Sequence, residues 1–137
     1  MRSLFATPMM AGAAAALALA SSAAMAIDHP VTANPNLTFS PQFLTINAGD
    51  TVTFTNAGGM HNVASDPGAV PSFHCSTACG ASPVGDPNST LWTQTIAFPT
   101  PGTVGFHCDQ HGAPGAGMFG TITVSPTPVE LQSFEID

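Results

Sequence analysis

Residues 106–124 read FHCDQHGAPGAGMFGTITV, and this stretch joins two strand patterns through a glycine-rich loop. In Thr103–His107 the apolar Val104 and Phe106 fall on every second position, and Phe119–Val124 alternates in a similar way. Alternation with a period of two is typical of a strand with one buried face. The sequence therefore predicts two strands, with Cys108–Gly117 as the loop between them.

The rest of the chain carries the same strand-and-turn signals and almost no helix signal. Thirteen Gly and thirteen Pro also favour a turn-rich β protein. Val31–Pro35 is expected to be a loose start, and Asn56–Thr90 to be largely irregular. The predicted class is all-β, with two sheets packed face to face. Further strands are expected at Leu37–Phe39, Phe43–Ile46, Thr51–Thr55 and Trp92–Phe98.

Length and composition favour one globular domain. The chain has 137 residues, of which 44% are hydrophobic, and this apolar fraction is too high for a disordered chain. The formal net charge is −7, which argues against a nucleic-acid partner.

Residues 1–26 have the form of a signal peptide that is removed on export. Arg2 is followed by an uncharged, Ala-rich stretch with Met9–Ala20 as its apolar centre. Ala24-Met25-Ala26 then has the small-x-small form of a cleavage site. The alternative is an uncleaved membrane anchor, because residues 3–27 carry no charge. The weakly apolar, Ala-rich centre favours cleavage, and hence a periplasmic or secreted protein without stable membrane insertion.

Cleavage would leave residues 27–137 as a single domain, with 125–137 as a loose tail. This part holds all eight acidic residues and no Lys or Arg, since Arg2 is the only one in the chain. Such a surface attracts cationic partners, although the acids could also serve solubility alone.

Four residues form a possible metal-ligand set: His61, Cys108, His111 and Met118. Two imidazoles and a thiolate with a weak axial thioether are the ligands of a blue-copper centre. Each residue also has an ordinary interpretation. Cys108 could be a buried structural thiol, His61 a strand-end histidine, and Met118 a core side chain.

The sequence resembles the cupredoxins, and among them the small plastocyanin-like bacterial copper proteins. The resemblance runs from about Phe39 to Val124. It implies a Greek-key β-sandwich with one type 1 copper near one end, which cycles between Cu(II) and Cu(I) as a one-electron carrier. The matching motifs are Asn47–Val52, Met60–Val63, Pro101–Thr103, Phe106–Cys108, His111 and Met118–Val124.

Carried over residue by residue, the resemblance implies that His61, Cys108 and His111 are the strong copper ligands and Met118 the axial one. It also implies that Asn62 hydrogen-bonds across the ligand loop and orients it. One departure is the spacing: six residues separate His111 from Met118, where plastocyanins usually have four.

The remaining two cysteines, Cys75 and Cys79, are expected to form a disulfide, because export leads to an oxidising compartment. The rival interpretation is a second metal site that also uses His74, although these residues are too few for a closed zinc site. His107 is expected to be an exposed polar residue. Its alternatives are an electron exit beside Cys108 and a ligand to a second copper.

The favoured function is an electron carrier rather than an enzyme. The alternatives are a copper-dependent enzyme module, resembling a nitrite reductase or multicopper oxidase, and a copper storage or delivery protein. Multicopper oxidases need His-x-His pairs and a His-Cys-His run, but residue 109 is Asp. The expected protein is a monomer. Its expected partners are redox proteins with a basic docking surface, such as a c-type cytochrome or an oxidase or reductase.

Overall fold

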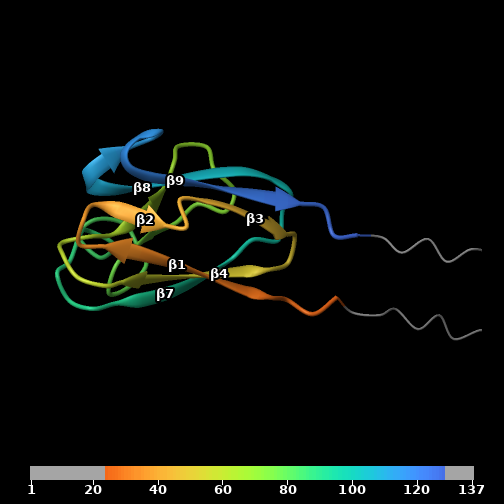
Figure 1. Cartoon of the computed structure of the whole chain (residues 1–137), viewed down its shortest axis with the longest axis horizontal. Coiled ribbons are helices and arrows are strands. Elements are labelled where there is room, and N and C mark those ends of the chain that lie inside the picture. Colours follow the sequence, from red (N-terminus) through yellow and green to blue (C-terminus); the bar gives the residue numbers. More distant parts are fainter. Residues whose placement is uncertain (1–23, 129–137) are drawn as a thin grey trace, which may run out of the picture.

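The computed structural model describes residues 24–128 and shows nine strands in two packed sheets (Figure 1). No helix occurs within this range, and the all-β sandwich expected from the sequence is confirmed. Most of the expected signal peptide and of the expected tail lies outside the described residues. The strands are β1 (Asp28–Asn34), β2 (Thr38–Ser40), β3 (Phe43–Asn47), β4 (Thr51–Asn56), β5 (Val63–Ser65), β6 (His74–Cys75), β7 (Thr93–Ala97), β8 (Gly102–Ala113) and β9 (Ala116–Ser125).

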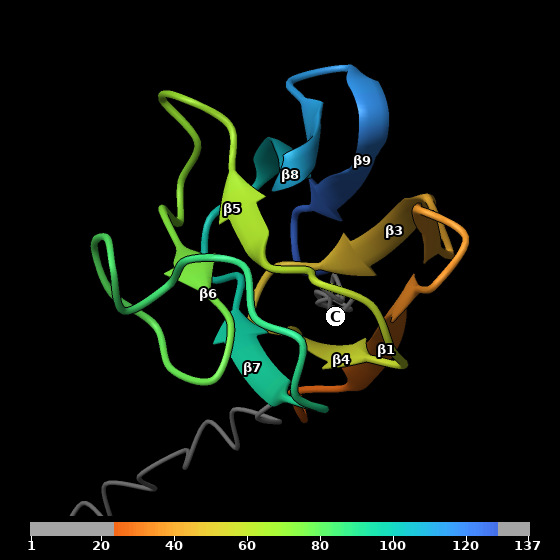
Figure 2. The ribbon, with the colours of Figure 1, turned by 90° about the vertical axis from the view of Figure 1, so that its left-hand side faces the viewer.

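The two sheets have different strand orders. One runs β2-β1-β4-β7, and the other runs β3-β9-β8-β5-β6. The pairs β1 with β4 and β3 with β9 are parallel, and the other pairs are antiparallel. The end view in Figure 2 shows β1, β4 and β7 on one side and β5, β8 and β9 on the other.

Alternation along the central strands supplies the core between the sheets. Val52 and Phe54 of β4 are fully buried, as are Val104 and Phe106 of β8. The rings of Phe54 and Phe106 meet edge to face with 5.2 Å between centroids, an arrangement that aromatic pairs favour. These contacts join the two sheets and make β8 a rigid support for the residues that follow Phe106.

The expectation of a loose start at Val31–Pro35 is wrong for most of that segment. β1 is a regular strand that pairs with β4 from Asp28 to Ala33, and Val31 and Ala33 are each 1% exposed. The partner strand lies more than twenty residues further along the chain. Local sequence shows no sign of this parallel pairing, which supplies the backbone hydrogen bonds of β1.

The expected loop at Cys108–Gly117 is also mostly strand. The β8–β9 ladder shifts register between His107 and Gly112, and then resumes with the pairs Gly112–Gly117 and Ala113–Ala116. The chain reverses at Pro114-Gly115, where the φ of Gly115 is 70°, a value that glycine adopts without strain. The expected loop is therefore reduced to a turn at Pro114-Gly115 between two long strands.

Asp50 fixes the turn between β3 and β4, and with it the start of β1. Its buried carboxylate accepts hydrogen bonds from the backbone N–H of Ile27 and of Asn47, and pairs with the His29 ring, each at 3.0 Å. The N–H groups of Ile27 and Asn47, and then His29, hold the pKa of Asp50 below its ordinary value of 3.8. The ionised carboxylate therefore stabilises the folded protein.

We expect Asp50→Asn to lower the free energy of unfolding of the metal-free protein by about 2 kcal/mol at pH 6, because charge-assisted hydrogen bonds are lost. A group with a lowered folded pKa contributes stability above its unfolded pKa, and that contribution is lost as the pH falls through the folded value. The difference between variant and wild type should therefore shrink below pH 3.8. Urea unfolding at pH 6 and at pH 3 checks this, and an equal difference at both values would contradict it.

Candidate metal centre

Two strands and one connection carry the four expected ligands. His61 lies in the connection between β4 and β5, where its N–H donates to the Asn88 carbonyl at 3.2 Å and its carbonyl accepts a hydrogen bond from the Trp92 indole at 3.0 Å. Cys108 and His111 lie in the part of β8 where the ladder with β9 shifts register. Met118 belongs to β9 and is 1% exposed.

The thiol and the two imidazoles form a compact donor group. Cys108 Sγ lies 3.8 Å from His61 Nδ1 and 3.6 Å from His111 Nδ1, and all three donor atoms lie within 4.8 Å of one another. His61 and Cys108 are fully buried, whereas His111 is partly exposed. Nitrogen and sulfur bonds of roughly 2.0–2.3 Å to a shared ion place donor atoms at about these separations. Thiolate and imidazole suit copper in both of its oxidation states, so the residues present fit a copper ion.

The surroundings of His61 favour its neutral, metal-binding form. Burial, and then the neighbouring His111, hold the pKa of His61 below its ordinary value of 6.5. Gly59 packs against the ring, because a Cβ atom at this position would lie 2.7 Å from His61 Nε2. The Gly59 backbone therefore restricts the His61 ring, whose Nδ1 faces Cys108 Sγ. The lone pair of Nδ1 is available to a metal there.

Asn62 links the His61 connection to the ligand-bearing part of β8. Its Oδ1 accepts a hydrogen bond from the Asp109 N–H at 2.9 Å, and its Nδ2 donates to Asp109 Oδ2 at 2.6 Å. The same Nδ2 lies 3.0 Å from the Gly85 carbonyl, to which it also donates. These contacts cross the ligand loop, as the role predicted for Asn62 requires, and that role stays a prediction.

The longer hairpin keeps the backbone of Met118 beside the ligand loop. Gly112 follows His111 and packs against the Met118 backbone so closely that a Cβ atom at residue 112 would overlap it. Gly117 has a φ of 66° and lies against the His111 carbonyl. Both glycines therefore allow the Met118 backbone to lie close to the ligand-bearing segment, and the axial role of Met118 stays a prediction.

A row of histidines and aspartates adjoins Cys108, and sequence reasoning missed it. Nδ1 of His107 lies 2.7 Å from Asp66 Oδ1, and its Nε2 lies 3.4 Å from Asp109 Oδ1. The His107 side chain is only 12% exposed, so the expectation of an exposed residue is wrong. On the other side of Asp109, Nε2 of His74 lies 2.7 Å from its Oδ2. No local pattern reveals these pairs, because His107 lies 41 positions after Asp66 and Asp109 lies 35 positions after His74.

The pKa values of His74 and Asp109 are both shifted, in part because the two side chains contact each other. Burial opposes the charge on His74, but the hydrogen bond to the Gly80 carbonyl and the Asp109 carboxylate outweigh it and raise the pKa of His74. Burial likewise opposes the charge on Asp109, but hydrogen bonds from Asn62 and His74 lower its pKa. Both shifts favour an ion pair at neutral pH.

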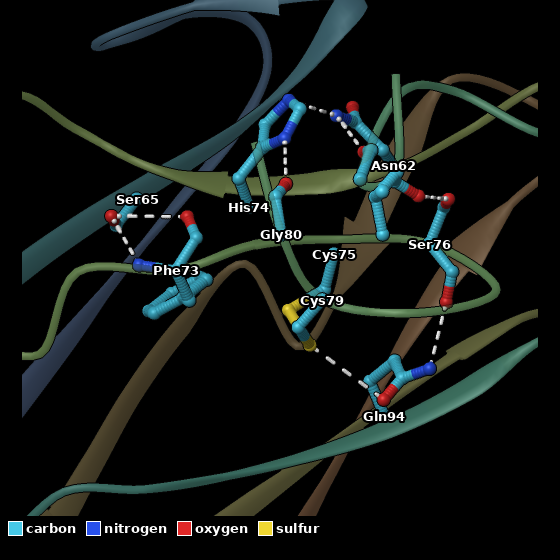
Figure 3. The surroundings of a disulfide bond; sticks show 11 residues. Asn62, Ser65, Phe73, His74, Cys75, Ser76, Cys79, Gly80 and Gln94 are labelled. Carbon is cyan, nitrogen blue, oxygen red and sulfur yellow. Dashed lines mark hydrogen bonds between the residues drawn. A yellow bond between two sulfur atoms is a disulfide. The ribbon is translucent and has the colours of Figure 1, made fainter. Parts of the chain in front are cut away.

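The disulfide between Cys75 and Cys79 is present, as the sequence predicted (Figure 3). Cys108 is the free cysteine of the described chain and is buried. The rival interpretation, a metal site that uses His74 with these two cysteines, is wrong because both sulfur atoms are bonded to each other.

Within residues 24–128 no helix is long and apolar enough to span a membrane. Residues 25–125 match the family described as copper binding proteins, plastocyanin/azurin family. The chloroplastic plastocyanin of Oryza sativa subsp. indica is 40% identical over 123 residues, covering 84% of this chain and 77% of that protein. The plastocyanin of Scenedesmus fuscus is 43% identical over 89 residues, covering 64% and 87%.

The solved structures give the same answer for the fold. The oxidised plastocyanin of Dryopteris crassirhizoma superposes with a TM-score of 0.53 at 27% identity, covering 71% of this chain and all of that one. The chain belongs to the plastocyanin/azurin family of copper binding proteins.

Proposed function

We propose that His61, Cys108 and His111 are the strong ligands of one type 1 copper and that Met118 is its weak axial ligand. As a member of its family, the chain is a type 1 copper protein that carries electrons, and it is not an enzyme. The observation that supports the ligand set best is the approach of both Nδ1 atoms to within 3.8 Å of the Cys108 sulfur.

When bound, copper supplies a Cu(II)/Cu(I) couple that takes up and releases one electron. The protein contributes a rigid donor set in which His61 and Cys108 are shielded from water. Because soft sulfur suits Cu(I) and imidazole suits Cu(II), the same side chains serve both states with little movement. His111 is the partly exposed ligand, and Gly112–Gly117 places small, uncharged residues beside it. That surface suits brief docking through a small interface.

Direct titration tests the ligand set. We expect the metal-free protein to bind one Cu(II) per chain and to develop an intense visible band that a reductant bleaches and an oxidant restores. A thiolate ligand is required for that charge-transfer band. Binding of copper without the band would show that Cys108 is not a ligand.

The finer assignments concern export and partners. We propose that residues 1–26 are removed on export to the periplasm or beyond, and that the protein acts there as a monomer. We further propose that its redox partner presents a basic surface, such as a c-type cytochrome or an oxidase or reductase. The proposed partner surface is supported by the charge of this chain, because no Lys or Arg follows Arg2. Three aspartates also contact histidines of β6 and β8 on the side of the sandwich that holds Cys108: Asp66, Asp86 and Asp109.

Reduction by a basic cytochrome should slow as salt increases. Raising the ionic strength from about 10 mM to about 150 mM shortens the screening length from about 30 Å to about 8 Å. Because electrostatic steering is lost, we expect the second-order rate constant to fall about tenfold. Stopped-flow mixing measures it, with a small neutral reductant as the control. A flat dependence with the cytochrome would show that the acidic residues serve solubility only.

A further inference from the structure

Asp109 joins the ligand-bearing part of β8 to the disulfide-closed loop of β6. We propose that His74 is a positioning residue for the copper site: acting through Asp109, it holds the Cys108–His111 segment in its metal-binding shape. The inference rests on the proposed ligand set, since it assigns a purpose to a residue outside that set. Neither His74 nor Asp109 was singled out for such a role by the sequence.

The Cys108–His111 segment needs support that the sheet does not provide. The β8–β9 pairs stop at His107 and resume at Gly112, so the intervening residues have no ladder partner in β9. Their restraint comes instead from side chains that converge on Asp109. Its N–H donates to Asn62, and its Oδ2 accepts hydrogen bonds from Asn62 at 2.6 Å and from His74 at 2.7 Å.

His74 is itself held on two sides. Its Nδ1 donates to the Gly80 carbonyl at 2.9 Å (Figure 3). The Gly80 N–H donates back to the His74 carbonyl, also at 2.9 Å. The disulfide between Cys75 and Cys79 closes the turn that separates these two residues. Gly85 packs against the ring so closely that it has no room for a side chain. Because these contacts hold the His74 ring independently of Asp109, the ring can restrict the position of the Asp109 side chain.

The first test needs no copper. In the metal-free protein at neutral pH, His74→Ala should accelerate hydrogen exchange at the Asp109, Gln110 and His111 amides roughly tenfold, because a charge-assisted hydrogen bond is lost. His74→Gln should restore much of the protection, because its amide can still donate to Asp109. The matched control is His29→Ala, which breaks another histidine–aspartate pair at 3.0 Å, at the far end of β4. That variant should lose stability without changing exchange at these three amides.

The second test uses the reduction potential of the loaded protein. His74→Ala should shift it, because Asp109 Oδ2 loses the hydrogen bond from His74 and the Cys108–His111 segment is held less firmly. In an Asp109→Asn background the same change should have little further effect, since residues that act through one another are not additive. If His74→Ala behaves like His29→Ala, or if its effects persist unchanged with Asp109→Asn, the positioning role is wrong. Failure to bind copper at all would instead contradict the ligand set.

A second, independent observation lies at the other end of the sandwich. The backbone nitrogen of Ile27 is 3.0 Å from Oδ1 of Asp50, a residue that is only 4% exposed. The Ile27 carbonyl is held as well, because it accepts a hydrogen bond from the Thr51 N–H at 3.0 Å. Ala24-Met25-Ala26, the expected cleavage motif, ends at the residue before Ile27 and is exposed.

We infer that cleavage after Ala26 creates an ion pair that stabilises the mature protein. Water adds across the Ala26–Ile27 peptide bond, so that Ala26 leaves with the new carboxylate and Ile27 keeps the amino group, which is largely protonated at neutral pH. The Ile27 amide that donates to Asp50 thereby becomes a cation with further donors. This inference rests on the proposed cleavage site, but its test does not require natural processing.

The test compares two chains released from a fusion by a protease, one beginning at Ile27 and the other at Ala26. Both carry one α-amino group, but only the first places it at Asp50. The chain that begins at Ile27 should have a folding equilibrium constant roughly tenfold higher at pH 7, since hydrogen bonds to charged groups are strong. The difference should vanish with Asp50→Asn. Equal stability of the two chains, or a difference that survives Asp50→Asn, would overturn the inference.

Discussion

Replacing Cys108 with serine should abolish the intense visible band of the copper-loaded protein. The band arises from charge transfer between thiolate sulfur and Cu(II), and a serine hydroxyl supplies no comparable orbital. Cys108 is the free thiol of the described chain, and its sulfur lies within 3.8 Å of both imidazole nitrogens. Optical absorption after addition of one equivalent of Cu(II) measures the loss.

The two other cysteines provide a matched control. Cys75 and Cys79 are bonded to each other, so replacing both with serine should leave the band in place. That double variant should instead be less stable by about 2 kcal/mol or less, because its disulfide closes only a short loop. Retention of the band in Cys108→Ser would show that its thiolate is not the ligand.

Substitution of Met118 should move the reduction potential in opposite directions according to the side chain introduced. Met118→Leu removes a weak sulfur donor, and the potential should rise because Cu(II) loses an electron donor. Met118→Gln supplies a harder oxygen, which favours Cu(II), and the potential should fall. Each shift should reach about 59 mV or more, which for one electron is a tenfold change in the equilibrium constant.

Voltammetry of the two variants separates an axial ligand from a core side chain. Met118 is 1% exposed, so either variant will also alter packing, but a packing change alone gives no reason for shifts of opposite sign. Met60→Leu is the control, because Met60 adjoins His61 yet is 44% exposed. The blue colour should persist in all three variants. Equal potentials in wild type and both Met118 variants would mean that Met118 only packs against its neighbours.

Much of the candidate site could be predicted from sequence because its chemistry is local. Cys108 and His111 lie three residues apart on one segment, and a thiolate with an imidazole as donors indicates copper. The spacing of Cys75 and Cys79 likewise restricted them to a local disulfide or a small metal site, and the structure has the disulfide. His61 was harder to assign, because it lies 47 positions before Cys108; its side chain made it a candidate, and the resemblance of Met60–Val63 to a family motif supported it.

The all-β class could be predicted from the sequence, because alternation along segments such as Thr51–Thr55 indicates which face of a strand is buried. Three features became apparent only in the folded chain: β1 is a strand, the β8–β9 hairpin extends to Pro114-Gly115, and His74 reaches Asp109. Each of these three features depends on contacts with residues distant in sequence, or on backbone hydrogen bonds that produce no periodic pattern of side chains. Backbone pairing is nearly independent of side-chain identity, and an ion pair across 35 residues has no local signature. Such contacts are specified only when the packed sheets bring distant segments together.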